Sequence, residues 1–292
     1  MDLENSFFSY RRRASWPQFE PPLGREATEC LEAVDFDSPD LDRALGKMRV
    51  VAVASAEILA FVRAVWEPEP RDAVPESESD DLIPDGAPVR GVLTRSAVRT
   101  TGWFNSLKNG AMTACESLGE MYAAAIFECD PRVRGYVPQP LTLRYPEDKG
   151  RVRHHVPDWL VWRHDGPYVV EIKPAAKAMQ PDWRWRFQLC RLFLQGHGIR
   201  YRVWDEHVVT QEPRISNCRA LLRFRDQPVQ TDERQRVLEH LARTSVATIA
   251  ELAAAADAPD GGAVVHALML RGFFDFDLNQ PIGPETALRR AP

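Results

Sequence analysis

Apolar and polar positions along the chain first mark out a central block in which helical and extended patterns alternate. Helix-forming residues run over 111–128, and the Asp130-Pro131 pair ends this run. Short apolar runs typical of strands follow at residues 141–145, 156–163 and 168–172. The pattern therefore predicts a helix followed by several short strands.

The second half of this block predicts a hairpin, a helix and a final strand. Asp165-Gly166 separates the last two strand patterns and is a strong turn signal. A helical pattern covers about 182–195, with Gly196 as a candidate C-cap, and a strand pattern covers 199–204. The order of helix, strands, helix and strand predicts a mixed α/β unit rather than a doubly wound sheet.

The C-terminal residues carry a different pattern. Residues 231–243 are amphipathic, and 248–251 fit a capping box that opens a second short helix. Residues 261–271 predict a third helix that Gly272 ends, and 273–278 alternate apolar and acidic positions as a strand does. Three short helices and a terminal hairpin predict a winged-helix-like domain.

The residues ahead of the central block predict an attached region of unknown role. Apolar positions over 39–66 have mostly helical spacing, although 49–54 is strand-like. Segment 67–85 has four prolines, eight acids and no aromatic residue, so it cannot bury enough apolar surface to offset the entropy of ordering. We expect an N-terminal helical region, an acidic Pro-rich linker, an α/β core and a C-terminal domain, at residues 1–66, 67–95, 96–228 and 229–292.

Charge is distributed unevenly along the 292 residues. The net charge is -5, which excludes a uniformly basic nucleic-acid coat. Residues 96–230 nevertheless carry 20 bases against 14 acids, and the parts on either side are acidic. A basic block in an acidic chain is typical of a domain that handles a polyanion, and the alternative is that these arginines are simply solvated.

Cysteine usage and hydropathy indicate the compartment. The five cysteines include no Cys-x-x-Cys pair, which favours a reducing compartment and no zinc knuckle. No apolar stretch approaches the roughly 20 residues of a membrane-spanning helix, and acids precede bases at the N-terminus, unlike a secretory signal. We expect a soluble cytoplasmic protein without a membrane partner.

The residues best suited to chemistry lie on the predicted hairpin. Asp158 belongs to its first strand and Glu171 to its second, so the two carboxylates can converge. With the carbonyl oxygen of Ile172 they form a hard, oxygen-rich site suited to Mg²⁺, which lowers the pKa of a bound water and offsets phosphate charge. Lys173 shares a strand face with Glu171 and can orient the attacking water. The alternative is a surface hairpin with a solvated Glu-Lys pair.

Further motifs surround this hairpin in a fixed order, at residues 116–120, 128–131, 137–140, 155–158 and 170–174. On these motifs the sequence resembles the TnsA-type endonuclease subunits of heteromeric transposases, within the PD-(D/E)XK restriction-endonuclease-like superfamily. The resemblance spans about 95–210. It implies a restriction-endonuclease-like mixed sheet core with flanking helices, followed by the winged-helix-like domain.

The resemblance also implies a site and an activity. In the family, an acid on the upstream helix joins the hairpin residues, which here gives Glu120, Asp158, Glu171 and Lys173, with the three acids holding one or two Mg²⁺ ions (or Mn²⁺). The activity would be cleavage of double-stranded DNA at the 5′ ends of a transposon. The partners would be a transposase subunit and an ATP-dependent regulator. Alternatives are a standalone nuclease for restriction, repair or phage defence, and a non-catalytic adaptor.

Several residues keep open interpretations. His154 and His155 can contact phosphate or carry protons, but neighbours on a strand point to opposite faces, so one is expected to be structural. Glu116 lies four residues before Glu120 and would replace it if the helical register slipped. The aromatic and basic residues of 183–191 either track a DNA backbone or belong to a helix packed on the sheet. The weakly basic tail favours docking to protein over independent DNA binding.

Overall fold

The structure is a computed structural model, and it describes residues 39–53, 102–146 and 151–291. The predicted linker at 67–95 and most of the predicted N-terminal region at 1–66 lie outside the described residues. The remaining residues form a mixed α/β fold with several sheets, as predicted, and this fold is compatible with a restriction-endonuclease-like core.

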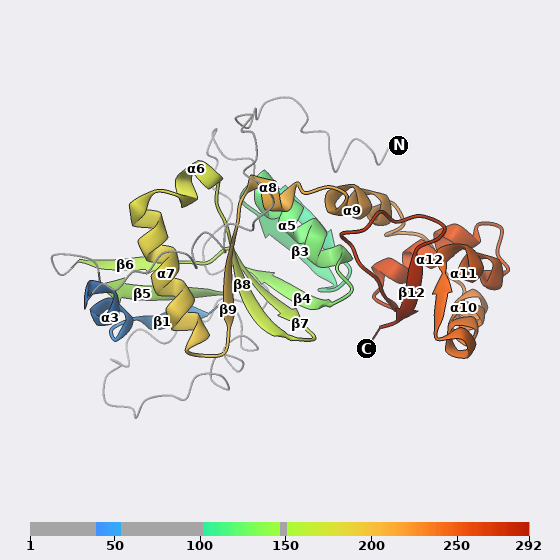
Figure 1. The fold of residues 1–292 in the computed structure, drawn as a ribbon, viewed down its shortest axis with the longest axis horizontal. Helices are drawn as coiled ribbons and strands as arrows, with labels where there is room; N and C mark the ends of the chain where they lie inside the picture. The colour runs from blue at the N-terminus through green and yellow to red at the C-terminus, as the bar shows by residue number, and fades with distance from the viewer. Residues whose placement is uncertain (1–38, 54–101, 147–150, 292) are drawn as a thin grey trace.

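A four-stranded sheet lies at the centre of the molecule (Figure 1). Its strands, in spatial order, are β4 (Val133–Pro138), β7 (Trp159–Arg163), β8 (Gly166–Ile172) and β9 (Arg200–Trp204). The hairpin predicted at Asp165-Gly166 is confirmed, and Gly166 adopts a positive φ of 108° there. β8 and β9 pair in parallel, so the chain needs a crossover between them, and the helix predicted at 182–195 provides it.

Helices cover both faces of this sheet. α5 (Leu118–Cys129) lies on one face and α7 (Pro181–Gln195) on the other (Figure 1). Alternation along β8 explains the two layers, because Tyr168 packs with Phe127 of α5, whereas Val169 packs in the cluster that holds Phe187 of α7. Gly196 is the C-cap of α7, as predicted. Each face of the sheet therefore has its own apolar core.

The helix predicted over 111–128 is shorter than expected. Residues Ala111–Cys115 form strand β3, which pairs antiparallel with β2 (Gly102–Ser106), and only then does α5 begin. Helix propensity at these positions is overridden by cross-strand pairing, and Ser117 sets the helix start by accepting a hydrogen bond from the Glu120 backbone N–H. The prediction was wrong for 111–115 and confirmed for the second half of the run.

The strand predicted over 156–163 is also shorter than expected, because it begins three residues later. Residues 152–155 form β6 (Val152–His155), which pairs with β5 (Leu141–Pro146) in a second sheet, whereas β7 begins only at Trp159. Pro157 has no N–H for a ladder, and the chain crosses from one sheet to the other at this point. Asp158 therefore immediately precedes a strand instead of lying inside it.

Part of the predicted N-terminal region contributes to the second sheet. Helix α3 (Pro39–Leu45) precedes β1 (Arg49–Val53), which pairs antiparallel with β5 and completes the order β1-β5-β6. Leu41 and Met48 are buried in the same apolar cluster as residues of α7. The segment 39–53 thus packs on the core, and the predicted division between residues 1–66 and 96–228 stays a prediction.

The C-terminal residues form three helices and a small antiparallel sheet. The helices are α10 (Thr231–Thr244), α11 (Ile249–Ala256) and α12 (Gly261–Leu270), and the sheet has the order β10-β12-β11 (Val246–Thr248, Ala287–Arg290, Phe274–Asp275). Each helix forms where the sequence predicts it, including the capping box between Thr248 and Glu251.

Short helices connect the elements, namely α6 (Ala175–Ala178), α8 (Glu206–Val209) and α9 (Arg214–Leu222). The last of these joins the core to the C-terminal helices (Figure 1). Asn217 fixes this junction, because its buried side-chain amide donates to the carbonyl oxygens of Leu278 and Gln280 at 2.9 and 2.7 Å. Within the described part of the chain, no helix is long and apolar enough to cross a membrane.

Candidate active site

Three of the predicted site residues meet where β7 begins and β8 ends. Lys173 Nζ lies 2.9 Å from Glu171 Oε1. Asp158 Oδ2 accepts a hydrogen bond of 2.6 Å from the backbone N–H of Ile172, which fixes its carboxylate beside the same strand end. Burial raises the pKa of Asp158 well above its usual value, and the charges of Glu171 and Glu120 add to this effect. The hairpin therefore brings Asp158, Glu171 and Lys173 together.

The fourth predicted residue reaches the site from α5. Glu120 lies in the first turn of the helix, where its carboxylate accepts from the Glu116 backbone N–H at 2.8 Å and from Ser117 Oγ at 2.9 Å. Burial raises the pKa of Glu120, and the charges of Glu116 and Glu171 raise it further. The charge of Glu171 thus raises the pKa of both Glu120 and Asp158.

A glycine permits this approach of helix and strand. A Cβ atom at Gly119 would lie 2.8 Å from Ile172 Cγ2, which is closer than real Cβ contacts. Since Gly119 has no side chain, the first turn of α5 packs directly against the end of β8. The position of Glu120 beside the hairpin depends on this contact.

Sequence reasoning left the role of His155 open, and the structure brings it into the site. His155 is buried at the end of β6, and its Nε2 atom lies 3.1 Å from Glu171 Oε2, whereas His154 is exposed. The expectation that these neighbours point to opposite faces is confirmed. Burial alone would raise the pKa of Glu171, but His155 and Lys173 outweigh this effect and lower it to about 2. Glu171 is therefore an ionised, buried carboxylate.

The lysine has a second partner on α7. Lys173 Nζ lies 4.4 Å from the ring centroid of Trp183, and the Lys177 and Arg186 side chains approach the same ring at 5.0 and 4.3 Å. Burial opposes the charge on Lys173, but the carboxylates of Glu171 and Asp158 outweigh it and raise its pKa. Lys173 thus stays a cation held between a carboxylate and an aromatic ring.

Comparison with known families agrees with this geometry. Residues 130–206 match the family model described as the TnsA-like endonuclease N-terminal domain. This segment is similar to that family. The match includes Asp158, Glu171 and Lys173, and it confirms the resemblance drawn from the motifs and indicates a nuclease role in transposition. No curated protein sequence matches the chain.

Two other acids of the TnsA-type motifs have structural roles. Glu116 lies before the N-cap of α5, so it is not the helical neighbour of Glu120 that the sequence predicted, and it accepts from Gln139 Nε2 at 2.9 Å. Glu128 is fully buried, and its carboxylate accepts from Ser106 Oγ, Tyr136 Oη and the backbone N–H of Leu107. Glu128 therefore anchors the turn between β2 and β3 to α5.

The donor set of the TnsA-like site suits a divalent cation. Carboxylates gathered where β7 begins and β8 ends form the oxygen-rich, negative environment that Mg²⁺ prefers, and Glu171 Oε2 has no hydrogen bond of good geometry. In the described residues, however, no three His, Cys, Asp or Glu side chains lie close enough to enclose an ion. Backbone N–H and hydroxyl donors bind the carboxylates of Glu120 and Asp158 instead. The residues therefore fit the ion in their chemistry, and these hydrogen bonds would have to rearrange when it binds.

The remaining predicted roles are structural. Cys115, Cys129 and Cys190 are buried core residues, as expected.

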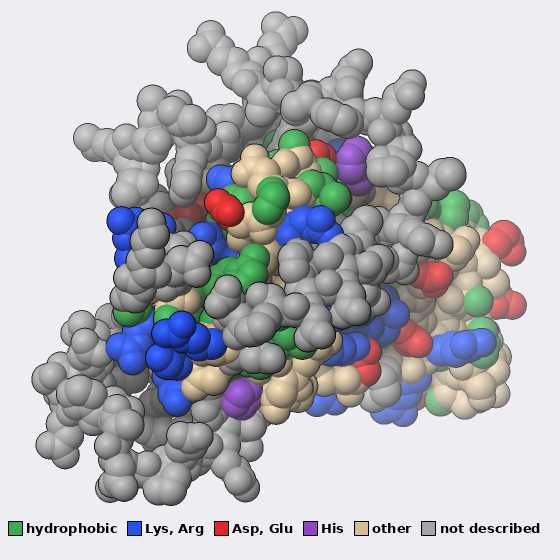
Figure 2. All heavy atoms as spheres, turned by 60° about the vertical axis from the view of Figure 1, so that its left-hand side comes forward, with side chains coloured by type: hydrophobic (Ala, Val, Ile, Leu, Met, Phe, Trp, Pro, Cys, Tyr) green, Lys and Arg blue, Asp and Glu red, His purple; other side chains and the backbone are tan. Residues whose placement is uncertain are grey.

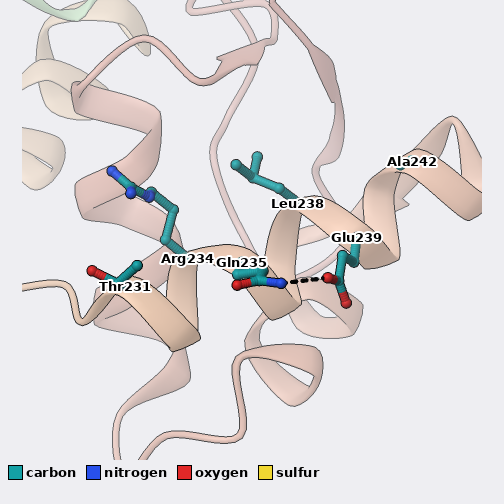
Figure 3. Close-up of a pocket in the computed structure, with 6 residues that line it drawn as sticks. All are labelled: Thr231, Arg234, Gln235, Leu238, Glu239 and Ala242. Carbon is teal, nitrogen blue, oxygen red and sulfur yellow. Dashed lines mark hydrogen bonds between the residues drawn. The ribbon is translucent and has the colours of Figure 1, made fainter.

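A surface hollow on α10 (Figure 3), of about 370 Å³, is lined by side chains of that one helix, where Gln235 donates to Glu239 at 2.8 Å. It brings together no groups from separate elements, and therefore it is no rival to the site at Glu171.

Proposed function

We propose that the protein is a metal-dependent DNA endonuclease that cleaves the 5′ ends of a transposon during cut-and-paste transposition, while a separate transposase cleaves the 3′ ends. The observation that carries this proposal is the meeting of Asp158, Glu171 and Lys173 in a segment that matches the TnsA-like endonuclease domain. The resemblance supplies the strand preference and the partners, which include an ATP-dependent regulator.

The side chains have distinct tasks in this proposal. Glu120, Asp158 and Glu171 would hold one or two Mg²⁺ ions, whose chemistry is to acidify a bound water and to neutralise charge on the phosphate. The Lys173 ammonium, directed by Glu171 and Trp183, orients the attacking water and offsets charge that develops on the phosphate oxygens. The His155 ring lies beside the second oxygen of Glu171, with Nε2 at 3.1 Å, and so limits the movement of this carboxylate.

We propose that DNA binds across the side that carries α7. Figure 2 brings this side forward and shows Lys and Arg side chains gathered on it. The apolar face of α7 packs on the sheet through Phe187 and Leu194, which leaves Arg184 and Arg191 partly exposed. A basic face beside the site is what the phosphate backbone requires.

We interpret the C-terminal part as a winged-helix-like domain that docks to protein. Its three helices and small sheet support this interpretation. Residues 231–292 carry six bases against nine acids, and Arg271 is the only base of the third helix and its end. Such an acidic surface would bind DNA phosphates weakly. Docking to a partner subunit of the transposase complex requires no phosphate contacts.

Strand-specific cleavage in a reconstituted complex tests the proposed function. The protein, its transposase and the regulator are mixed with a transposon-end duplex in which each strand carries its own label. We expect Mg²⁺-dependent cleavage of the 5′ strand with wild type and with the control Glu212→Gln, which changes an exposed acid outside α7, and none with Asp158→Asn.

The outcomes separate the rivals. Cleavage by the protein alone, without partners, would indicate a standalone nuclease. Normal cleavage of the 5′ strand by Asp158→Asn would place the activity in another subunit and leave this chain as an adaptor.

A further inference from the structure

A second polar cavity lies at the far end of α5 from the candidate active site. It has a volume of about 390 Å³ and is adjacent to Ile126 and Asp130 at the C-terminal end of the helix. Glu120 and Asp130 are ten residues apart, or about 15 Å along a helix axis, so the two sites are separate. Nothing in the proposed cleavage mechanism uses this cavity.

Arginines from four different elements line it, and we call it the arginine cavity. Its walls include Arg132, Arg163, Tyr168, Arg202, Arg214 and Asn279. Asp130 is the one carboxylate among the described lining residues. Residues so far apart in sequence converge here because β4, β7, β9 and α9 end or pass beside one another. The convergence of four guanidinium groups on one hollow is the feature to explain.

Two of the four arginines form ion pairs with acids near the cavity. Arg132 is compensated, because its Nε and Nη2 atoms donate to the two oxygens of Asp130 at 3.1 and 3.3 Å, and the charges of Asp277 and Asp275 also act on it. Arg163 Nε lies 3.1 Å from Asp165, a residue that is about half exposed and that also pairs with Arg200. The partners of Arg163 thus lie toward solvent.

Aromatic rings hold the guanidinium groups around the cavity. The Arg163 guanidinium lies 5.8 Å from the ring centroid of Tyr168, and that of Arg214 lies 5.8 Å from the ring of Trp204. Tyr168 is buried, and burial raises the pKa of its hydroxyl, whereas the charges of Arg163, Arg202 and Arg132 act in the opposite direction. Three positive charges therefore act on one hydroxyl in the cavity wall.

The wall contributed by the C-terminal part is well fixed. Asn279 follows Leu278, whose carbonyl oxygen accepts from the buried amide of Asn217, and the Asn217 side chain also accepts from the Ile282 backbone N–H at 3.2 Å. Asn279 itself donates to Asp277 through its backbone N–H and side-chain amide. The cavity is thus built from both the core and the C-terminal residues.

We propose that the arginine cavity binds an oxyanion of the phosphate class, either a soluble phosphate or nucleotide or a phosphate of the DNA backbone. Guanidinium groups match phosphate oxygens in geometry and charge, and amide and hydroxyl groups beside them supply further donors. The volume falls in the range of small-ligand sites. A bound anion would connect the core to the C-terminal residues, because both contribute to the walls.

Calorimetric titration and thermal melts of the full chain with inorganic phosphate and pyrophosphate test this proposal, with chloride at matched ionic strength as the reference. The test variant is Arg202→Gln, and the control is Arg243→Gln, which removes an equal charge from the exposed face of α10. We expect saturable binding and a raised Tm for wild type and the control, and roughly tenfold weaker binding for Arg202→Gln. Arg163→Gln, on a different strand, gives an independent test if the first variant folds poorly.

A parallel titration with a short DNA duplex identifies the source of the phosphate. If Arg202→Gln loses phosphate and pyrophosphate binding but keeps its DNA affinity, the site binds a soluble ligand. If it also loses DNA affinity, the site binds a phosphate of the DNA backbone. The proposal would be overturned if chloride and phosphate changed the Tm equally. It would also be overturned if Arg202→Gln and Arg163→Gln bound phosphate as tightly as wild type. These readouts need no cleavage, so failure of the proposed nuclease function is detected separately.

Discussion

Lys173 Nζ lies 2.9 Å from Glu171 Oε1, and each residue stabilises the charged form of the other. Glu171 is 1 % exposed on its side chain and Lys173 17 %, so the pair lies largely out of water, where such a contact is strong and its loss is expensive. Glu171 is the second-last residue of β8 and Lys173 is the first residue after it, where its backbone N–H still donates to the Trp204 carbonyl oxygen of β9 at 2.9 Å. The pair therefore determines both the stability and the chemistry of this end of the sheet.

Replacement of the lysine separates these two effects. Lys173→Met leaves the buried Glu171 with His155 alone, and we expect unfolding to become easier by about 2 to 3 kcal/mol and cleavage to fall by roughly 10² or more. Lys173→Arg keeps the charge but not the compact ammonium, so it should recover most of the stability and little of the activity. Chemical denaturation and the 5′-strand assay measure the two quantities. Full activity in Lys173→Met would remove this residue from the mechanism.

The aromatic partner of the lysine should affect activity more than folding. The Trp183 ring is partly exposed on α7, and its contact with Lys173 is worth about 0.5 to 2 kcal/mol. Trp183→Leu should therefore slow cleavage roughly three- to thirtyfold, while Trp183→Phe should retain most of the rate. A single-turnover comparison at saturating DNA measures this effect, and equal rates for Leu and wild type would count against a positioning role.

Most of the core was predictable from sequence, because its elements have strong local signals. The Asp165-Gly166 turn, the apolar β8 and the Pro181 start of α7 all agree with the structure. The hairpin acids and Lys173 were found because their spacing is set by β alternation within one supersecondary unit. Their meeting required no knowledge of distant contacts.

The errors have a common cause in long-range pairing. Residues Ala111–Cys115 have helix propensity but form a strand with Gly102–Ser106. Arg49–Val53 is a strand, as its pattern indicates, but its partner β5 lies more than 80 residues later and could not be predicted. His155 enters the site because β6 belongs to a different sheet from β7, which no local pattern reveals. The arginine cavity was missed for the same reason, since its four arginines come from separate elements.

The close contact at Gly119 should be sensitive to a single added methyl group. In Gly119→Ala the new Cβ would meet Ile172 Cγ2 at 2.8 Å, so the start of α5 must move away from β8. We expect a net loss of about 1 kcal/mol, because the strain is partly offset by the helix preference of alanine, and a roughly tenfold slower cleavage because Glu120 moves with the helix. The matched control is Gly135→Ala, whose Cβ would meet only Asn109 Oδ1 at 3.5 Å. If both variants behave alike, the contact does not position Glu120.

A partly buried lysine at the other end of α5 should give stability a distinct pH dependence. Lys108 Nζ donates to the carbonyl oxygens of Phe127 and Asp130 at 2.9 and 2.6 Å, and burial lowers its pKa from 10.5 to about 8. Between pH 8 and 10.5 the unfolded chain then binds more protons at this residue than the folded chain, so its contribution to the free energy of unfolding increases with pH. Relative to Lys108→Met, wild type should gain on the order of 1 to 3 kcal/mol from pH 7 to pH 10. A difference that is constant across this range would contradict the lowered pKa.

Metal binding can be measured without cleavage, which matters because a subunit that acts only in a complex can be inactive alone. If Asp158 and its neighbours hold a divalent ion, Mn²⁺ or Mg²⁺ should raise the Tm of the folded protein, and the gain is about 2.7 kcal/mol at 100 times the Kd. Asp158→Asn removes a carboxyl group whose pKa is raised by burial and by the charges of Glu171 and Glu120, so the metal-free variant should melt higher than wild type and respond less to metal. Glu212→Gln, which changes an exposed acid outside α7, should behave as wild type in both respects. If the metal raises the Tm equally in all three proteins, the ion binds elsewhere. If it raises the Tm of wild type only after duplex DNA is added, the substrate phosphate completes the site.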